Sequence, residues 1–126
     1  MGIKVQEIVS KDYTEVVILW NDVLGVSTVT GENFRVTMDQ MIRADNYKTF
    51  VALLENHVVG FISMVHALAL GSANGYLHIT GLAVHNDFQR HKVGTELLRY
   101  TENYAKDSGM SSIISPWSDY CMRRRT

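Results

Sequence analysis

The sequence has few residues that cross-link or interrupt a chain, since one of its 126 residues is cysteine and one is proline. The single cysteine, Cys121, has no partner for an internal disulfide and no CxxC spacing typical of zinc. Apolar runs are also short. The run from Val58 to Val65 is interrupted by Gly60 and Ser63 and falls well below the ~20 residues of a membrane-spanning helix. These features predict a protein without disulfide, metal site or membrane span.

Neither sign of charge dominates. Lys and Arg together number 12 and Asp and Glu 13, which gives a net charge of −1. Binding to nucleic acid or to an anionic membrane needs a dominant basic patch, so neither is expected as the main partner. The three arginines at 123–125 are typical of a solvated tail.

The first seven residues, MGIKVQE, lack the basic start and apolar middle of a secretion signal. Together with the lone cysteine, this predicts a cytoplasmic protein. Apolar residues make up 46% of the sequence, which is enough for a folded core, and the length fits a single domain over residues 1–126.

Hydrophobic periodicity predicts the element order β, α, α, β, β, β, α, β. The expected strands are 3–9, 49–54, 58–67, 76–84 and 111–115, and the expected helices are 13–24, 33–45 and 93–108. Glu55-Asn56-His57 suits a hairpin turn, and residues 71–75 suit a loop. The last helix is long enough to connect parallel strands, while the middle strands suit an antiparallel meander. The fold class is therefore α/β (α+β), with a mixed, mostly antiparallel central sheet flanked by helices.

Two local patterns refine this prediction. In the second helix, Thr37 and Gln40 have the spacing of a capping box, and Met38, Met41 and Ile42 form the expected buried stripe. In the fourth strand, Gly81 predicts a bulge or a close approach of another group to the backbone.

The segment from residue 82 to residue 98 carries the chemistry. A strand ends in a turn rich in cationic and hydrogen-bonding side chains, and a helix starts near Gly94. The first N–H groups of a helix lack intrahelical partners and attract phosphate. Gly94 permits close approach, Thr95 offers a hydroxyl, and Arg90 and Lys92 supply charge. The local pattern indicates a pyrophosphate site, although many strand-to-helix connections carry a glycine and a few polar residues.

The whole pattern resembles the acetyl-CoA-binding motif of the GCN5-related N-acetyltransferases. The signature of that family, Gln/Arg-x-x-Gly-x-Gly/Ala after a Leu-x-Val strand, corresponds here to Gln89-Arg90-His91-Lys92-Val93-Gly94 after Leu82-Ala83-Val84. Val58-Val59-Gly60-Phe61-Ile62 is typical of the third strand of the family, and the resemblance covers about residues 3–114.

The resemblance implies acetyl transfer from acetyl-CoA, as cosubstrate and without a metal, directly to a primary amine of a small molecule or protein. It implies that the backbone of Leu82, Ala83 and Val84 bonds the pantetheine arm and the acetyl carbonyl. The turn Gln89, Arg90, His91, Lys92, Val93, Gly94 and Thr95 would hold the pyrophosphate. Acceptor choice in the family is set by the first helices and their loop, here residues 24–35.

Two positions depart from the family pattern. Lys92 replaces the first signature glycine, at a cost in backbone freedom that its charge offsets in part. Thr80 stands where many relatives carry a glutamate that acts as base through water. His78 lies two residues earlier on the same strand face and can accept a proton near neutral pH, with a structural hydrogen bond as the alternative role. His57, His85 and His91 fall in turns and are expected in solvent. His66, in the neighbouring predicted strand, has the same two possible roles as His78.

Relatives continue after the strand equivalent to 111–115 with a helix and two strands, and a tyrosine there protonates the coenzyme thiolate. Residues 116–126 are too few for these elements, so the resemblance suggests a C-terminally shortened relative in which Tyr120 is the available acid. An unpaired edge at 111–115 predicts a homodimer. The alternatives are a catalytically impaired acyl-CoA-binding or interaction domain, and a structural dimerisation module that leaves the Gln89–Thr95 pattern unexplained.

Overall fold

The computed structural model describes residues 2–24, 31–70, 72–89, 92–110 and 112–114. Its element order is the predicted one, with short 3₁₀ turns added before α1 and after β4. The elements are β1 (Lys4–Glu7), η1 (Ser10–Asp12), α1 (Tyr13–Leu24), α2 (Gly31–Ala44), β2 (Tyr47–Leu54), β3 (His57–Ala69), β4 (Ser72–Val84), η2 (Asn86–Phe88), α3 (Val93–Asp107) and β5 (Ile113–Ile114).

One sheet connects the five strands in the order β1-β2-β3-β4-β5. The first four strands pair antiparallel, and β5 pairs parallel with β4 through α3. The predicted meander, the parallel crossover and the mixed α/β class are therefore confirmed. The last strand is shorter than expected within the described residues, since positions 111 and 115 lie outside them.

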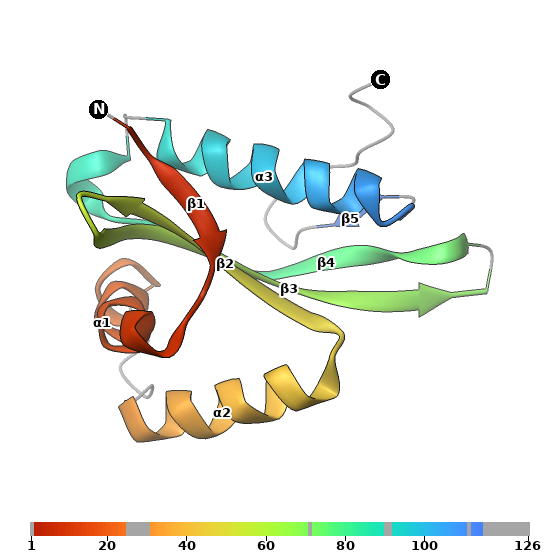
Figure 1. The fold of residues 1–126 in the computed structure, drawn as a ribbon, viewed down its shortest axis with the longest axis horizontal. Coiled ribbons are helices and arrows are strands. Elements are labelled where there is room, and N and C mark those ends of the chain that lie inside the picture. The colour runs from red at the N-terminus through yellow and green to blue at the C-terminus, as the bar shows by residue number, and fades with distance from the viewer. Residues whose placement is uncertain (1, 25–30, 71, 90–91, 111, 115–126) are drawn as a thin grey trace.

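The sheet lies between two helical layers, with α3 on one face and α1 and α2 on the other (Figure 1). Alternation along β3 explains this arrangement, because successive side chains point to opposite faces of a strand. Ile62 and Met64 pack in the cluster under α3, whereas Phe61 packs in the cluster under α1. On α3, Val93, Leu97, Thr101 and Ala105 are buried and form the face that packs on the sheet.

The β2–β3 hairpin confirms the predicted turn and explains its tightness. Glu55 and Asn56 form a two-residue loop with φ values of 52° and 67°. Positive φ at both central residues is the mark of a type I′ turn, whose twist matches the flanking strands. His57 belongs to β3 rather than to the turn.

The predicted loop at 71–75 is wrong, because β4 already begins at Ser72. This strand extends the hairpin with β3, where Ala69 pairs with Ser72 and Ala67 with Tyr76. Gly75 accommodates the irregular pairing with a φ of +76°. Polar and small residues here are tolerated because the end of the β3–β4 hairpin projects beyond the helices (Figure 1).

The second helix differs from expectation at its start and on its buried face. It begins at Gly31, so Thr37 lies inside the helix and the predicted capping box is wrong. Met38 is buried as predicted and Met41 is half-buried, but Ile42 is 61% exposed. A cavity lies between α2 and the sheet on the side of Met38 and Met41, and Ile42 does not line it.

Close packing of α3 on the sheet depends on Gly60 in β3. A Cβ atom at this position would lie 2.9 Å from Val93 Cγ1 and 3.2 Å from both the Ala83 carbonyl oxygen and Leu97 Cδ1. We expect Gly60→Val to lower the free energy of unfolding by about 1–3 kcal/mol, because overpacking strains a dense core. Denaturant unfolding measures the effect. Gly31→Ala is the matched control, since a Cβ there meets nothing within 4 Å, and an equal loss in both variants would contradict the prediction.

No described helix is both long and apolar enough to cross a membrane.

Candidate functional site

The turn between β4 and α3 is closed by its own side chains. His85 Nδ1 accepts a hydrogen bond from the Asp87 backbone N–H at 3.1 Å. Gln89 Nε2 donates to the Val84 carbonyl oxygen at 3.2 Å and to Asn86 Oδ1 at 3.1 Å. The amide of Gln89, a predicted binding residue, therefore fixes the turn in this structure. His85 is half-buried and caps η2 rather than lying free in solvent.

Lys92 is the N-cap of α3 and adopts the left-handed conformation, with φ 63° and ψ 19°. This backbone geometry explains why the family signature has glycine here, because a Cβ atom makes the left-handed region unfavourable. The Lys92 side chain is exposed and lines a cavity at the helix start. Arg90 and His91, its predicted companions, lie outside the described residues.

We expect Lys92→Gly to raise the free energy of unfolding by roughly 0.5–1 kcal/mol, because glycine relieves the left-handed strain. Lys92→Ala removes the same charge but keeps the Cβ atom, so it should bring no such gain. Denaturant unfolding of both variants separates backbone strain from charge. Equal stabilisation by both would show that the charge of Lys92, rather than its conformation, destabilises the fold.

The cavity at the helix start has a volume of about 310 Å³. Seven of the predicted binding residues line it, together with Val23 of α1; these are Leu82, Ala83, Val84, Gln89, Lys92, Gly94 and Thr95. Among the described residues, a Cβ atom on Gly94 would meet only Val84 Cγ2, at 3.7 Å, so no described contact requires glycine there. Val93, by contrast, is completely buried in the core under α3, so its side chain cannot reach the cavity.

Beside this cavity, the described strands leave part of one edge of β4 unpaired. Within the described strands, β5 pairs only with Leu77 and His78, so the stretch from Ile79 to Val84 has no strand partner on that side. Unpaired backbone N–H and C=O groups at a strand edge bind an extended ligand in the way a further strand would. The unpaired stretch of β4 therefore runs from Ile79 to Val84 and ends at the turn that leads into α3.

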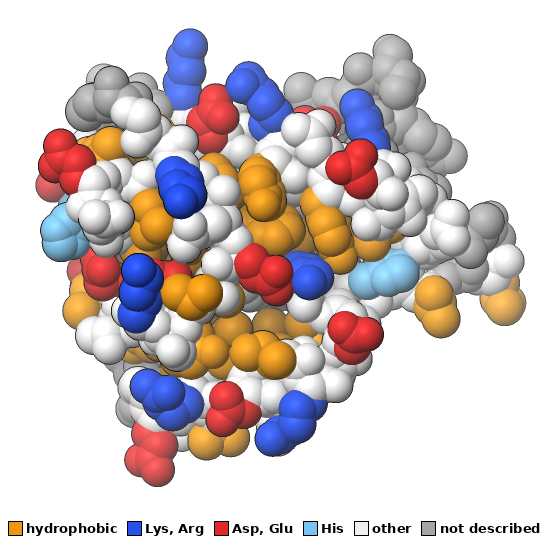
Figure 2. Space-filling model, in the orientation of Figure 1, with side chains coloured by type: hydrophobic (Ala, Val, Ile, Leu, Met, Phe, Trp, Pro, Cys, Tyr) orange, Lys and Arg blue, Asp and Glu red, His pale blue; other side chains and the backbone are white. Residues whose placement is uncertain are grey.

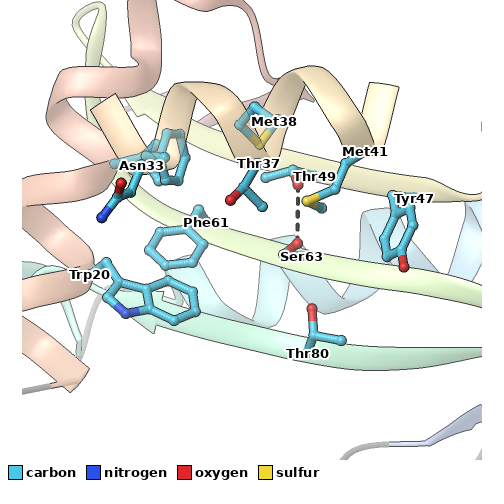
Figure 3. Close-up of a pocket in the computed structure, with 12 residues that line it drawn as sticks. Trp20, Asn33, Thr37, Met38, Met41, Tyr47, Thr49, Phe61, Ser63 and Thr80 are labelled. Atoms are coloured by element: carbon cyan, nitrogen blue, oxygen red, sulfur yellow. Dashed lines mark hydrogen bonds between the residues drawn. The ribbon is translucent and has the colours of Figure 1, made fainter. Parts of the chain in front are cut away.

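A second cavity, of about 390 Å³, lies between α1 and α2 and the strands β2, β3 and β4 (Figure 3). Hydrophobic side chains gather between α2 and the rest of the molecule (Figure 2). The polar groups are mostly hydroxyls on neighbouring strands, and Thr49 Oγ1 and Ser63 Oγ lie 3.1 Å apart. Its lining residues are Val16, Trp20, Asn33, Phe34, Thr37, Met38, Met41, Tyr47, Thr49, Phe61, Ser63 and Thr80.

The two cavities are neighbours along α1 and β4. Trp20 and Thr80 line the apolar cavity, while Val23, about one helical turn after Trp20, and Leu82, two residues after Thr80, line the cavity at the helix start. Between them, the Trp20 ring stacks on Phe61, with centroids 5.6 Å apart and planes inclined by 12°. A Cβ atom at Gly81 would lie 2.9 Å from Trp20 Cζ3, which confirms the predicted close approach at this glycine.

Thr80 owes its position to a bulge. The pairing of β3 with β4 passes from Met64–Ile79 to Ser63–Gly81, so Thr80 has no partner residue on β3. Its hydroxyl points towards Ser63 in Figure 3. The hydroxyls of Thr49, Ser63 and Thr80 thus come from three adjacent strands. The sequence reasoning missed this set, although the hairpin register places Thr49 opposite Ser63 and was a signal that could have found it.

The candidate proton carriers lie apart from these features. His78 is half-buried and pairs with Val65 and Ile114, and the residues found to line the two cavities in the described part of the chain do not include it. His66 Nε2 lies 2.6 Å from the Asn74 carbonyl oxygen, a structural contact. The role of His78 stays a prediction. Tyr120 and the segment predicted to form a homodimer fall within 111–126, which lies almost wholly outside the described residues. Among described residues, no three His, Cys, Asp or Glu side chains group as metal ligands.

The structure thus brings together a partly unpaired strand edge, the turn at the start of α3 and a second cavity beside them. Residues 7–119 match the family profile described as "Acetyltransferase (GNAT) family", and the chain belongs to this family of N-acetyltransferases. The resemblance and the predicted fold class are thereby confirmed. A comparison with curated protein sequences gives no match.

Solved structures share the fold at low sequence identity. A GNAT family acetyltransferase from Staphylococcus aureus has a TM-score of 0.81 at 19% identity, with 91% of this chain and 86% of that chain covered. Glucosamine-6-phosphate N-acetyltransferase from Arabidopsis thaliana has a TM-score of 0.79 at 17% identity, with 94% and 84% covered. The aminoglycoside N-acetyltransferase AAC(6')-Iy in complex with CoA has a TM-score of 0.77 at 14% identity, with 93% and 78% covered.

Proposed function

We propose that this chain transfers the acetyl group of acetyl-CoA directly to a primary amine. The observation that carries the proposal is the continuity of the site. The free edge of β4 leads to the N-terminus of α3 at one end and adjoins the apolar cavity at the bulge around Gly81. Family membership and the CoA complex of a structural neighbour support the assignment.

The residues present fit the coenzyme. The backbone of Leu82–Val84 offers hydrogen bonds to the amide groups of the pantetheine arm, and the first N–H groups of α3 face the pyrophosphate. Space in front of Gly94 lets phosphate oxygens approach the backbone, since only Val84 Cγ2 lies within 4 Å of a Cβ atom placed there. The Lys92 ammonium adds a positive charge at the same place.

The apolar cavity receives the acceptor. It adjoins β4 at the bulge, directly before Leu82–Val84, whose backbone the resemblance assigns to the pantetheine arm and the acetyl carbonyl. The Trp20–Phe61 stack forms one wall, and α2 forms another through Met38 and Met41. The hydroxyls of Thr49, Ser63 and Thr80 can both donate and accept hydrogen bonds, and so can orient an amine or a water molecule.

Titration calorimetry with acetyl-CoA, combined with an assay of free CoA thiol over a panel of amines, tests the proposal on the full chain. We expect saturable binding and amine-dependent thiol release. Failure of acetyl-CoA to bind would overturn the assignment.

Thr80 favours a second candidate, a coenzyme-binding domain without turnover. It lines the apolar cavity at the position where many relatives of this family carry a catalytic glutamate. Such a domain would bind acetyl-CoA with the same residues and release no thiol with any amine. The two measurements together distinguish the candidates.

A further inference from the structure

We propose that the acceptor is a weakly basic amine on an aromatic body, an arylamine or a similar heteroaromatic amine, and that it enters the apolar cavity uncharged. This inference rests on the proposed function and specifies its substrate class. Three features of the cavity carry it: its aromatic and thioether walls, its hydroxyl groups, and its position against the bulge of β4.

The walls fit a flat apolar body. The volume of about 390 Å³ is within the range of small-molecule sites. Trp20 and Phe61 supply aromatic surface from α1 and β3, and α2 contributes Phe34, Met38 and Met41. Thioether side chains adapt to ring edges and give favourable contacts with aromatic groups. An aromatic acceptor therefore gains contact on two sides.

The polar groups match a neutral amine better than an ammonium ion. Side-chain hydroxyls from Thr49, Ser63 and Thr80 accept and donate single hydrogen bonds, which is what an –NH₂ group needs. Thr49 is buried and Ser63 is half-buried, so an ammonium ion beside this pair loses hydration that the two hydroxyls do not fully replace, whereas Thr80 is exposed at the edge of the cavity.

The acceptor must also present a nitrogen with a free electron pair, which an ammonium ion lacks. In the reaction the amine nitrogen forms a bond to the acetyl carbon, the bond from that carbon to sulfur breaks, and CoA leaves as the thiol. The amine loses one proton and the leaving sulfur gains one, with water carrying the proton between them. An alkylammonium must lose an additional proton before its nitrogen can attack, whereas an arylamine already has a free electron pair at neutral pH. Hydroxyl groups can relay a proton but do not take it up at that pH.

Matched pairs of acceptors test the inference. Aniline and benzylamine, and their ring-substituted analogues, share the aromatic body and differ in basicity. We expect the anilines to give the higher kcat/KM near neutral pH. Amine ionisation should make little difference to the kcat/KM of the anilines as the pH changes in this range. For the benzylamines, kcat/KM should rise about tenfold for each pH unit as the free amine forms. A preference for benzylamines at neutral pH would overturn the inference while leaving the proposed acetyl transfer intact, because acetyl-CoA binding and thiol release would still be observed.

Thr80→Glu sharpens the test by placing a carboxylate at the edge of the cavity. We expect the ratio of benzylamine to aniline kcat/KM to rise by about 10–100-fold, since a hydrogen bond to a charged group contributes about 1.5–3 kcal/mol. Thr14→Glu is the control, because Thr14 is an exposed residue of α1 that does not line the cavity. An unchanged ratio in Thr80→Glu, with acetyl-CoA binding retained, would overturn the inference. Calorimetric titration of each variant with acetyl-CoA reports independently on the coenzyme site.

Discussion

Gly94→Glu is expected to lower acetyl-CoA affinity by at least about 100-fold, which corresponds to roughly 2.7 kcal/mol. The carboxylate would stand at the helix start, where the proposed pyrophosphate binds, and like charges placed together cost several kcal/mol. The fold itself should tolerate the change. A Cβ atom on Gly94 meets only Val84 Cγ2 at 3.7 Å, and a glutamate in the first turn of a helix interacts favourably with the helix dipole.

We therefore expect titration calorimetry to show a lower acetyl-CoA affinity for Gly94→Glu, and denaturant unfolding to show an unchanged free energy of unfolding. Asn103→Glu is the control, because it adds the same charge at an exposed position further along α3. Wild-type affinity in Gly94→Glu would place the phosphates elsewhere. A large loss of stability would instead show that the first turn of α3 is tighter than the space around Gly94 indicates.

The sheet and α3 were predictable because burial there follows simple sequence patterns. β3 is a nearly continuous apolar run that is buried on both faces, and the spacing of Val93, Leu97, Thr101 and Ala105 places one face of α3 against a core. The turn chemistry at Asn56 and the glycine signal at Gly81 are also local properties. The turn depends on the backbone conformation that Asn56 favours, and the close approach depends on the missing side chain of Gly81, so a residue type in the sequence indicates each of them.

The start of α2 and the extension of the β3–β4 hairpin were not predictable in this way. Ile42 has the spacing of a buried residue, but its helix lies beside a cavity and leaves it exposed. Ser72 and Gly75 have the composition of a loop, yet pairing with β3 holds them in a strand. In both cases tertiary contacts override a local preference.

The two parts of the candidate site also differ in how well the sequence predicts them. A contiguous motif predicts the coenzyme turn, and four of its residues, Gln89, Lys92, Gly94 and Thr95, line one cavity. The apolar cavity is built from five elements, and no short segment contains its pattern. Its shape depends on how far α2 stands from the sheet and on the ring of Trp20, both of which are tertiary features.

Gly81→Val is expected to change both stability and acceptor use. A Cβ atom at Gly81 lies 2.9 Å from Trp20 Cζ3 and 3.3 Å from Trp20 Cη2, so the indole must move away from its stack on Phe61. We expect the free energy of unfolding to fall by about 1–3 kcal/mol. The displaced ring should also reshape the apolar cavity, so that kcat/KM for the amine falls while acetyl-CoA binding at the turn is retained.

A double-mutant cycle with Trp20→Leu assigns the effect to this contact. The smaller side chain leaves room for valine, and the exchange breaks no hydrogen bond among the described residues, where the buried Trp20 Nε1 has no acceptor. The double variant should therefore be more stable than the sum of the two single changes by about 0.5–3 kcal/mol, the range for residues in contact. Additive losses would mean that valine disturbs the bulge of β4 directly, and that the ring of Trp20 does not set the boundary between the two cavities.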